Sequence, residues 1–258
     1  MRDSEDFVTQ HYRDFLGREP DPAGLQFWTN EIESCGADAQ CREIKRINVS
    51  AAFFLSIEFQ ETGYLVYRTY KAAFGNMPGA PVPLRLGEFL PDKQEISRGV
   101  IIGQPGANAL LEQNKAAYFD AFVRRERFTD AYPTTLTPEQ YVDALNANTG
   151  GTLTAEERQA AIGEFAGAAS TADVGARARA LRRVAENAEF ARREKNRAFV
   201  LMEYFGYLRR NPNDAPDTGF GGYFFWLNKL NQFGGNFVQA EMVKAFIVSI
   251  EYQRRFGV

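Results

Sequence analysis

The chain has 258 residues, 45% of them apolar, which is enough to fill one large core or two smaller ones. Its formal net charge of −3 and isoelectric point near 5.5 provide no overall positive field, so nucleic acid is not expected as a partner. No run of about 20 apolar residues occurs, so we expect no membrane span. The first residues lack the apolar core of a signal peptide, so the chain is expected to be either cytosolic or a piece of a larger protein. Of the two we expect a piece, because the helical pattern begins almost at once.

The first predicted helix carries Tyr12 and Leu16 on one face, because residues four positions apart lie on the same side of a helix. We expect it to end at Gly17-Arg18-Glu19-Pro20, since proline disfavours helical geometry in the residue before it. Asp21 is then placed to cap a second helix that begins at Pro22. The spacing therefore predicts a helix, a tight turn and a second helix.

A further helix is expected over residues 47–60, with Val49, Phe53 and Ile57 facing the core. It ends in the pair Glu58-Phe59. None of these helices can bury its aromatic side chains alone, so the unit is expected to pack on others of its kind.

This pattern occurs four times along the chain. The four inward-facing pairs are Tyr12/Leu16, Tyr70/Phe74, Tyr141/Leu145 and Tyr204/Leu208. A closing aromatic follows each tyrosine after 47, 58, 49 and 48 residues, respectively Phe59, Phe128, Phe190 and Tyr252. We call these four units the first to fourth copies, and they predict an all-α fold. The first and fourth match best, and the third is the most diverged.

The coil between the copies predicts how they are grouped. Residues 79–83 and 99–106 are rich in Gly and Pro and account for the extra length of the second copy. Residues 132–139 form a polar linker that ends in Thr137, an expected helix cap before Pro138. We therefore expect two paired halves, residues 1–133 and 134–258, which could also pack as one compact domain.

Cys35 and Cys41, the two cysteines of the chain, lie six positions apart in a polar loop that a disulfide could close. A disulfide indicates an oxidising compartment, whereas the alternative is two unpaired thiols in a reducing cytosol. A zinc site would need further ligands, and the chain has a single histidine, His11. We expect no metal centre and no cofactor.

Two arginine and aspartate pairs lie at the predicted helix junctions, Arg18 with Asp21 and Arg210 with Asp217. Such a pair either fixes the turn as an ion pair or forms a ligand-binding loop. Trp28 and Trp226 follow these junctions on the next helix. They occupy helical positions typical of core residues, and the alternative is that they stack on a sugar.

The oxygen-rich segment 211–219 is a further candidate, for calcium. It departs from the EF-hand pattern because Ala215 replaces a ligand and Gly222 stands where the bidentate glutamate belongs. His11 has no serine or cysteine motif beside it, so triad-type catalysis is not predicted. We find no pattern of a catalytic site and expect a protein that is not an enzyme.

The motif Tyr-x-x-x-Leu-Gly-Arg-x-Pro-Asp-x-x-Gly-Leu-x-Phe-Trp, written by residues 12–28 and followed by Ser56, Glu58 and Phe59, resembles a bacterial family. It is a domain-of-unknown-function family related to phycobilisome linker domains. The similarity is specific over residues 7–60, good over 199–257 and weak between. Members look like accessory modules of large secreted or surface proteins, so the resemblance implies helical packing and partner binding rather than chemistry.

These observations lead to one functional expectation and one alternative. We expect a non-enzymatic interaction or assembly module of a secreted or cell-surface bacterial protein, which contacts another protein or its own copies. The alternative is a carbohydrate-binding module for a surface polysaccharide, with Arg18, Asp21, Arg210 and Asp217 at the site and Trp28 or Trp226 as the stacking surface.

Overall fold

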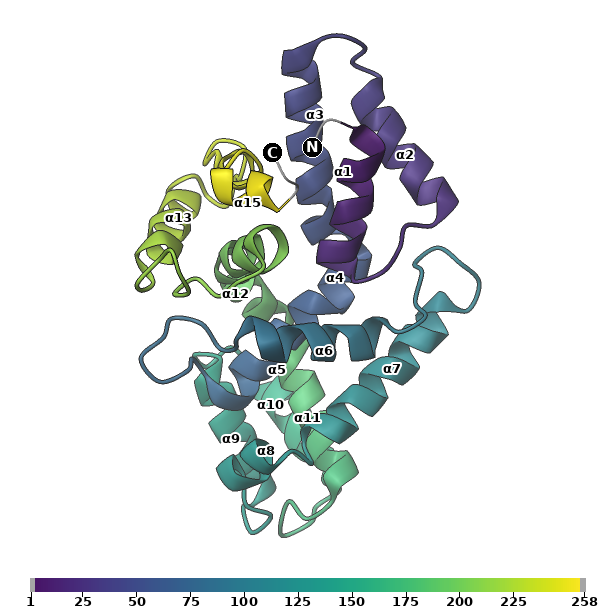
Figure 1. The fold of residues 1–258 in the computed structure, drawn as a ribbon. Coiled ribbons are helices and arrows are strands. Elements are labelled where there is room, and N and C mark those ends of the chain that lie inside the picture. Colours follow the sequence, from purple (N-terminus) through teal and green to yellow (C-terminus); the bar gives the residue numbers. More distant parts are fainter. Residues whose placement is uncertain (1–2, 256–258) are drawn as a thin grey trace. The chain divides into compact units, whose positions relative to one another are not determined.

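The computed structural model describes residues 3–255, and part of the predicted family match, residues 256 and 257, lies outside this range. The described chain is helical and contains no strand, which confirms the all-α prediction (Figure 1). The elements are α1 Ser4–His11, η1 Tyr12–Leu16, α2 Pro22–Glu33, α3 Ala39–Leu55, α4 Ile57–Glu61, α5 Gly63–Phe74, α6 Leu86–Ser97, α7 Ala107–Phe122, α8 Glu126–Ala131, α9 Pro138–Asn148, α10 Ala155–Gly163, α11 Val174–Ala185, α12 Ala188–Glu203, η2 Tyr204–Leu208, α13 Gly221–Gln232, α14 Met242–Ile247 and α15 Ile250–Arg254. None of the helices between residues 3 and 255 is long and apolar enough to cross a membrane.

The chain forms two compact units. Unit 1 contains the described residues up to Gly63 and from Asn196 onward, and unit 2 contains Tyr64–Lys195. Unit 1 thus joins the first and fourth copies, and unit 2 joins the second and third. This grouping differs from the predicted halves 1–133 and 134–258, which paired the copies in chain order.

In unit 1 the short segments that carry the repeated tyrosines are π-helical. In η1 and η2 the helix widens at Tyr12 and Tyr204 and ends at Gly17 and Arg209, which both adopt the left-handed conformation. Glycine adopts this conformation without cost, whereas an arginine side chain there is strained. Both segments therefore end at the same point of the motif, directly before Arg18 and Arg210.

Aromatic side chains from the two ends of the chain build the core of unit 1. Phe15 of η1 packs against Tyr207 of η2 with ring centroids 5.0 Å apart, and Phe54 of α3 stacks on Phe199 of α12 at 4.2 Å. All four side chains are almost fully buried. Edge-to-face and stacked pairs of this kind add to the free energy gained by burial alone. The first and fourth copies therefore share one interior.

A series of hydrogen bonds between polar side chains runs through this core. The imidazole of His11 shares hydrogen bonds of 2.7 Å with the Phe7 carbonyl and with the Ser50 hydroxyl. The Ser50 hydroxyl in turn bonds to the hydroxyl of Tyr207. Glu203 precedes Tyr204 as His11 precedes Tyr12, and both residues are buried. Neither carboxyl oxygen of Glu203 has a hydrogen-bond partner.

The predicted continuous helix over residues 47–60 is wrong. Ser56 leaves the helical conformation with a ψ of 146°, so the segment divides into α3 and α4. The Ser56 hydroxyl accepts the Phe59 backbone N–H and caps α4. This break turns the chain, so Val49 and Phe53 are buried as predicted while Ile57 is 66% exposed.

The four closing aromatics are all buried, as predicted: Phe59, Phe128, Phe190 and Tyr252. In three copies a small polar side chain caps the helix that carries them, namely Ser56, Asn187 and Ser249. In the second copy the corresponding residue is Arg125, and the Phe128 backbone N–H is bonded to its carbonyl instead.

Unit 2 packs α7 against α6 and α11, and α9 against α10 and α11. Tyr70, Phe122 and Phe128 form its aromatic centre, with the Tyr70 and Phe122 rings 5.1 Å apart. Arg125 holds Asp92 through two hydrogen bonds of 2.7 and 2.8 Å. Unit 2 is thus an aromatic core beside an ion pair in which Asp92 is buried and Arg125 is partly exposed.

Candidate functional site

Arg18 connects three segments of the first copy. Its Nε and Nη2 atoms donate to the two carboxylate oxygens of Glu58, at 2.7 and 2.8 Å. Its Nη1 atom donates to the Glu19 carbonyl at 3.1 Å and reaches Asp21 at 3.5 Å. The guanidinium also lies over the Tyr12 ring, 4.9 Å from its centroid. We call this arrangement the arginine bracket, because it ties the start of α2 to the start of α4.

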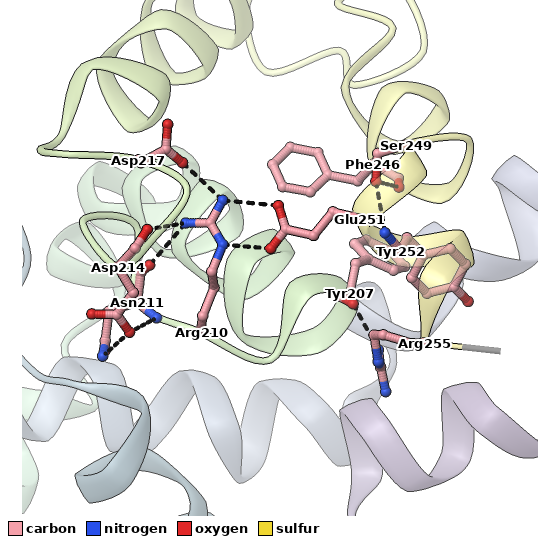
Figure 2. Close-up of polar contacts among 10 residues, drawn as sticks. All are labelled: Tyr207, Arg210, Asn211, Asp214, Asp217, Phe246, Ser249, Glu251, Tyr252 and Arg255. Atoms are coloured by element: carbon pink, nitrogen blue, oxygen red, sulfur yellow. Dashed lines mark hydrogen bonds and ion pairs between the residues drawn. The ribbon is translucent and has the colours of Figure 1, made fainter. Parts of the chain in front are cut away.

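Arg210 builds the same bracket in the fourth copy (Figure 2). Its Nε and Nη2 atoms donate to the carboxylate of Glu251 at 2.5 and 3.0 Å, and Nη2 also donates to Asp217 at 2.8 Å. Its Nη1 atom donates to the carbonyls of Asn211 and Asp214, each at 3.1 Å. The acceptors surround the guanidinium on every side that Figure 2 shows.

Both brackets favour charged arginine. Burial lowers the pKa of Arg18 and Arg210, but the hydrogen bonds that they donate to Glu58 and Glu251 outweigh it and leave each pKa raised. Burial likewise raises the pKa of the Tyr204 hydroxyl to about 12. The two arginines therefore stay charged and the Tyr204 hydroxyl stays protonated at neutral pH.

The pairs Arg18/Asp21 and Arg210/Asp217 are thus each brought together, with a glutamate that the sequence-based prediction did not include. Asp21 additionally accepts the Gly24 backbone N–H at 2.9 Å as the cap of α2. In this geometry the guanidinium donors face acceptors of the same chain, which matches the interpretation as a turn-fixing ion pair. The repeated sequence Ser-Ile-Glu, at 56–58 and 249–251, is the pattern from which these two glutamates could have been predicted.

The two tryptophans lie beside the brackets and are half-buried. Trp28 packs against Phe53 with centroids 6.1 Å apart, and Trp226 packs against Phe246 at 5.7 Å. Lys229 places its ammonium 5.4 Å from the Trp226 ring centroid. Each indole therefore contributes one face to the core of unit 1 and keeps part of its surface in solvent.

The calcium candidate, residues 211–219, is organised around Arg210. Asp214 accepts hydrogen bonds from the backbone and side chain of Asn211, while Asp217 accepts from Arg210. Because the guanidinium occupies the centre of these oxygens, a cation there would meet a positive charge. Nowhere in residues 3–255 do three or more His, Cys, Asp or Glu side chains gather in a way that could hold a metal ion.

Cys35 in the turn after α2 and Cys41 in the first turn of α3 lie at disulfide distance, with Cα atoms 5.6 Å apart. The pair closes the loop that the sequence predicted. It fixes the start of α3, where Asp38 accepts the backbone N–H groups of Gln40 and Cys41 at 3.0 Å.

The distribution of exposed apolar side chains is the feature that sequence reasoning missed. Every exposed large apolar residue of the described chain lies in unit 1: Phe27, Ile44, Leu55, Ile57, Phe224, Phe225, Phe233, Val238, Val248 and Ile250. Three pairs occupy matching positions of the first and fourth copies, Phe27/Phe225, Leu55/Val248 and Ile57/Ile250. The exposed fractions agree closely, 56% and 57% for the phenylalanines and 66% and 68% for the isoleucines.

Phe27 lies on α2 and Ile57 on α4 in the first copy, as Phe225 lies on α13 and Ile250 on α15 in the fourth. Leu55 ends α3 and Val248 follows α14, each just before the short helix that carries the exposed isoleucine. We call the three residues of each copy its apolar surface. Beside Ile250, a hollow of about 690 Å³ opens between α15 and the Ala215-Pro216 turn.

The comparisons with known proteins concern the first copy. Residues 2–62 match a family model described as "Domain of unknown function (DUF4214)". The match covers the first bracket from Arg18 to Glu58 and the first apolar surface. No curated protein and no solved structure matches the chain.

Proposed function

We propose that the chain is a non-enzymatic interaction module of a secreted or cell-surface bacterial protein, and that it binds a protein through the apolar surfaces of unit 1. The observation that carries this proposal is the concentration of exposed large apolar side chains in unit 1, in matching positions of two copies. Single exposed apolar residues are common on proteins. Here two copies expose the same three positions, and we attribute this recurrence to binding.

The brackets support this role because they make the surfaces rigid. Arg18 ties Asp21, the cap of the helix that carries Phe27, to Glu58, which follows Ile57. A surface held in its binding conformation loses less conformational entropy when a partner binds. The resemblance to modules of secreted or surface proteins and the cysteine pair support the extracellular location.

A carbohydrate-binding module is the second candidate, because both indoles keep part of their surface in solvent next to an exposed phenylalanine. The Phe27 and Trp28 rings lie edge to face at 4.8 Å, and Phe225 and Trp226 at 5.0 Å. Sugar binding also needs polar groups that can reach the hydroxyls, and the bracket arginines are engaged within the chain. Glycan-array binding that is lost in Trp28→Ala and Trp226→Ala would favour this candidate.

The proposed function is tested by capture of envelope proteins on the immobilised chain. The variant Ile57→Asn with Ile250→Asn should capture markedly less than the unchanged chain, because it places amide groups where a partner would bury apolar side chains. The matched control, Thr134→Asn with Gln159→Asn, changes two exposed residues of unit 2 and should capture as the unchanged chain does. Equal capture by all three proteins would contradict the proposal.

A further inference from the structure

The two copies that form unit 1 carry opposite net charges. Residues 1–63 contain six Lys or Arg against twelve Asp or Glu, a formal net charge of −6. Residues 196–258 contain seven Lys or Arg against five Asp or Glu, a formal net charge of +2. Unit 2 is almost neutral, with 17 basic and 16 acidic residues. The asymmetry therefore belongs to unit 1. Part of it is used inside that unit, where Lys244 pairs with Glu43 and Arg255 pairs with Asp14.

The opposite charges occur at matching positions beside the exposed apolar residues. Three residues after Trp28 stands Glu31, and three residues after Trp226 stands Lys229. Glu31 pairs with Lys45 at 2.7 Å, and its side chain is still exposed to solvent. Lys229 in turn lies 3.6 Å from the carboxylate of Glu241. The two copies thus place residues of opposite charge at matching positions of α2 and α13, and each of these residues has an ion-pair partner in its own copy.

A second charge difference lies on the helix that carries the exposed isoleucine. Three residues after Glu58 stands Glu61, and three residues after Glu251 stands Arg254, which is exposed. Glu61 ends α4 and Arg254 ends α15, so each charge lies about one turn from Ile57 or Ile250. An apolar centre with charges at its edge is the usual composition of a specific protein interface.

We propose that the partner of this module is a second copy of the same chain, and that the fourth-copy surface of one molecule docks on the first-copy surface of the next. This inference rests on the proposed function and names its partner. Glu31 and Glu61 would face Lys229 and Arg254 across the contact, around the apolar residues. Contacts between two first-copy surfaces are disfavoured, because they bring like charges together.

Such a contact is heterologous, since it joins two different surfaces of the same molecule. Each added molecule leaves one surface of each kind free, so the assembly is a ring if the rotation closes and a filament if it does not. The apolar residues of both surfaces are exposed in the folded chain, so the packing of the first copy on the fourth does not bury them.

A charge exchange tests the proposal by sedimentation velocity over a concentration series of the purified chain. Variant A carries Glu31→Lys and Glu61→Lys, so both of its surfaces are positive. Variant B carries Lys229→Glu and Arg254→Glu, so both are negative. The control carries Asp130→Lys and Glu156→Lys, two exposed residues of unit 2, and changes the net charge as variant A does.

We expect the unchanged chain and the control to associate, and variants A and B to associate at least about tenfold more weakly when each is alone. An equimolar mixture of A and B should associate again, with higher sensitivity to salt than an apolar contact has. The recovery in the mixture shows at the same time that both variants are folded. A variant that loses helical circular dichroism is replaced by its single substitutions, Glu31→Lys or Lys229→Glu.

Three outcomes would overturn the proposal: a monomeric unchanged chain at every concentration, self-association of A or B equal to that of the unchanged chain, or a mixture that stays monomeric. The capture experiment separates this failure from that of the proposed function. If the purified chain is monomeric but captures envelope proteins through Ile57 and Ile250, the self-association is wrong and the interaction function stands. If both experiments are negative, both proposals are wrong.

Discussion

The hydroxyl oxygen of Tyr204 fills the space beside Gly222, 2.5 Å from the point where a Cβ atom on that glycine would lie. Tyr12 and Gly24 stand in the same relationship in the first copy. A tyrosine that begins a π-helical segment thus requires a glycine in the first turns of the next helix. The motif is a set of contacts in three dimensions and not only a pattern of letters.

The first prediction follows from this contact. Gly222→Ala should destabilise the chain by about 1 to 3 kcal/mol, because the added methyl group overlaps the Tyr204 hydroxyl. Gly221→Ala is the matched control, since nothing lies within 4 Å of its Cβ position, and it should be neutral or slightly stabilising in the helix. Urea denaturation measures both. In a Tyr204→Phe background the Gly222→Ala cost should shrink, and an unchanged cost would refute the contact as its cause.

The second prediction concerns the bracket of the first copy. Arg18→Ala should lower the free energy of unfolding by about 3 kcal/mol, because it leaves the Glu58 carboxylate buried without its bidentate partner. Arg13→Ala removes a pair with Glu19 that is exposed on both sides, and it should have little effect. Chemical denaturation measures both variants. Equal losses of unfolding free energy in Arg18→Ala and Arg13→Ala would contradict the structural role of the bracket.

The third prediction is a loss of stability in acid that depends on His11. Burial lowers the pKa of His11 from 6.5 to about 4, although the Phe7 carbonyl and Asp14 act in the opposite direction and Arg255 adds to the lowering. Below pH 6.5 the unfolded chain therefore binds a proton that the folded chain does not. Stability is full above pH 6.5 and falls as the pH decreases toward 4, by about 3 kcal/mol from this group.

The measurement is urea denaturation between pH 7 and pH 4 for the chain and for His11→Gln. The variant is expected to be less stable at pH 7, because it changes the bonds to Phe7 and Ser50, but its stability should depend less on pH over this range. The same slope in both proteins would show that other groups cause the acid sensitivity.

The fourth prediction concerns Glu203, whose pKa burial raises well above 4.5. The folded chain holds a proton there that the unfolded chain releases above pH 4.5, so this group's contribution to stability is present below pH 4.5 and is lost as the pH rises. Glu203→Met should therefore stabilise the chain, since it also removes two carboxyl oxygens without partners. The gain should grow from pH 5 to pH 8 in thermal denaturation, and a gain that is constant with pH would contradict the buried, protonated carboxyl.

The class of the fold and the local rules of the motif follow from the order of the residues alone. Residues four apart mark one face of a helix whatever surrounds them, so Tyr12 and Tyr204 could be placed in cores. The Asp21-Pro22 start of α2 also follows from local chemistry, because a cap depends on the backbone within four residues. The six-residue spacing of Cys35 and Cys41 likewise allowed a disulfide-closed loop to be predicted from neighbouring residues alone.

Which copies share a core, and which side chains stay exposed to solvent, depends on contacts between distant segments. The first copy joins the fourth and not the second, because contacts such as Phe15 with Tyr207 connect residues almost 200 positions apart, where no local spacing rule applies. Ile57 shows the same limit, since a single turn at Ser56 moved it from a predicted core position to the surface. The apolar surfaces could be recognised only from solvent exposure, which depends on every segment that packs around them.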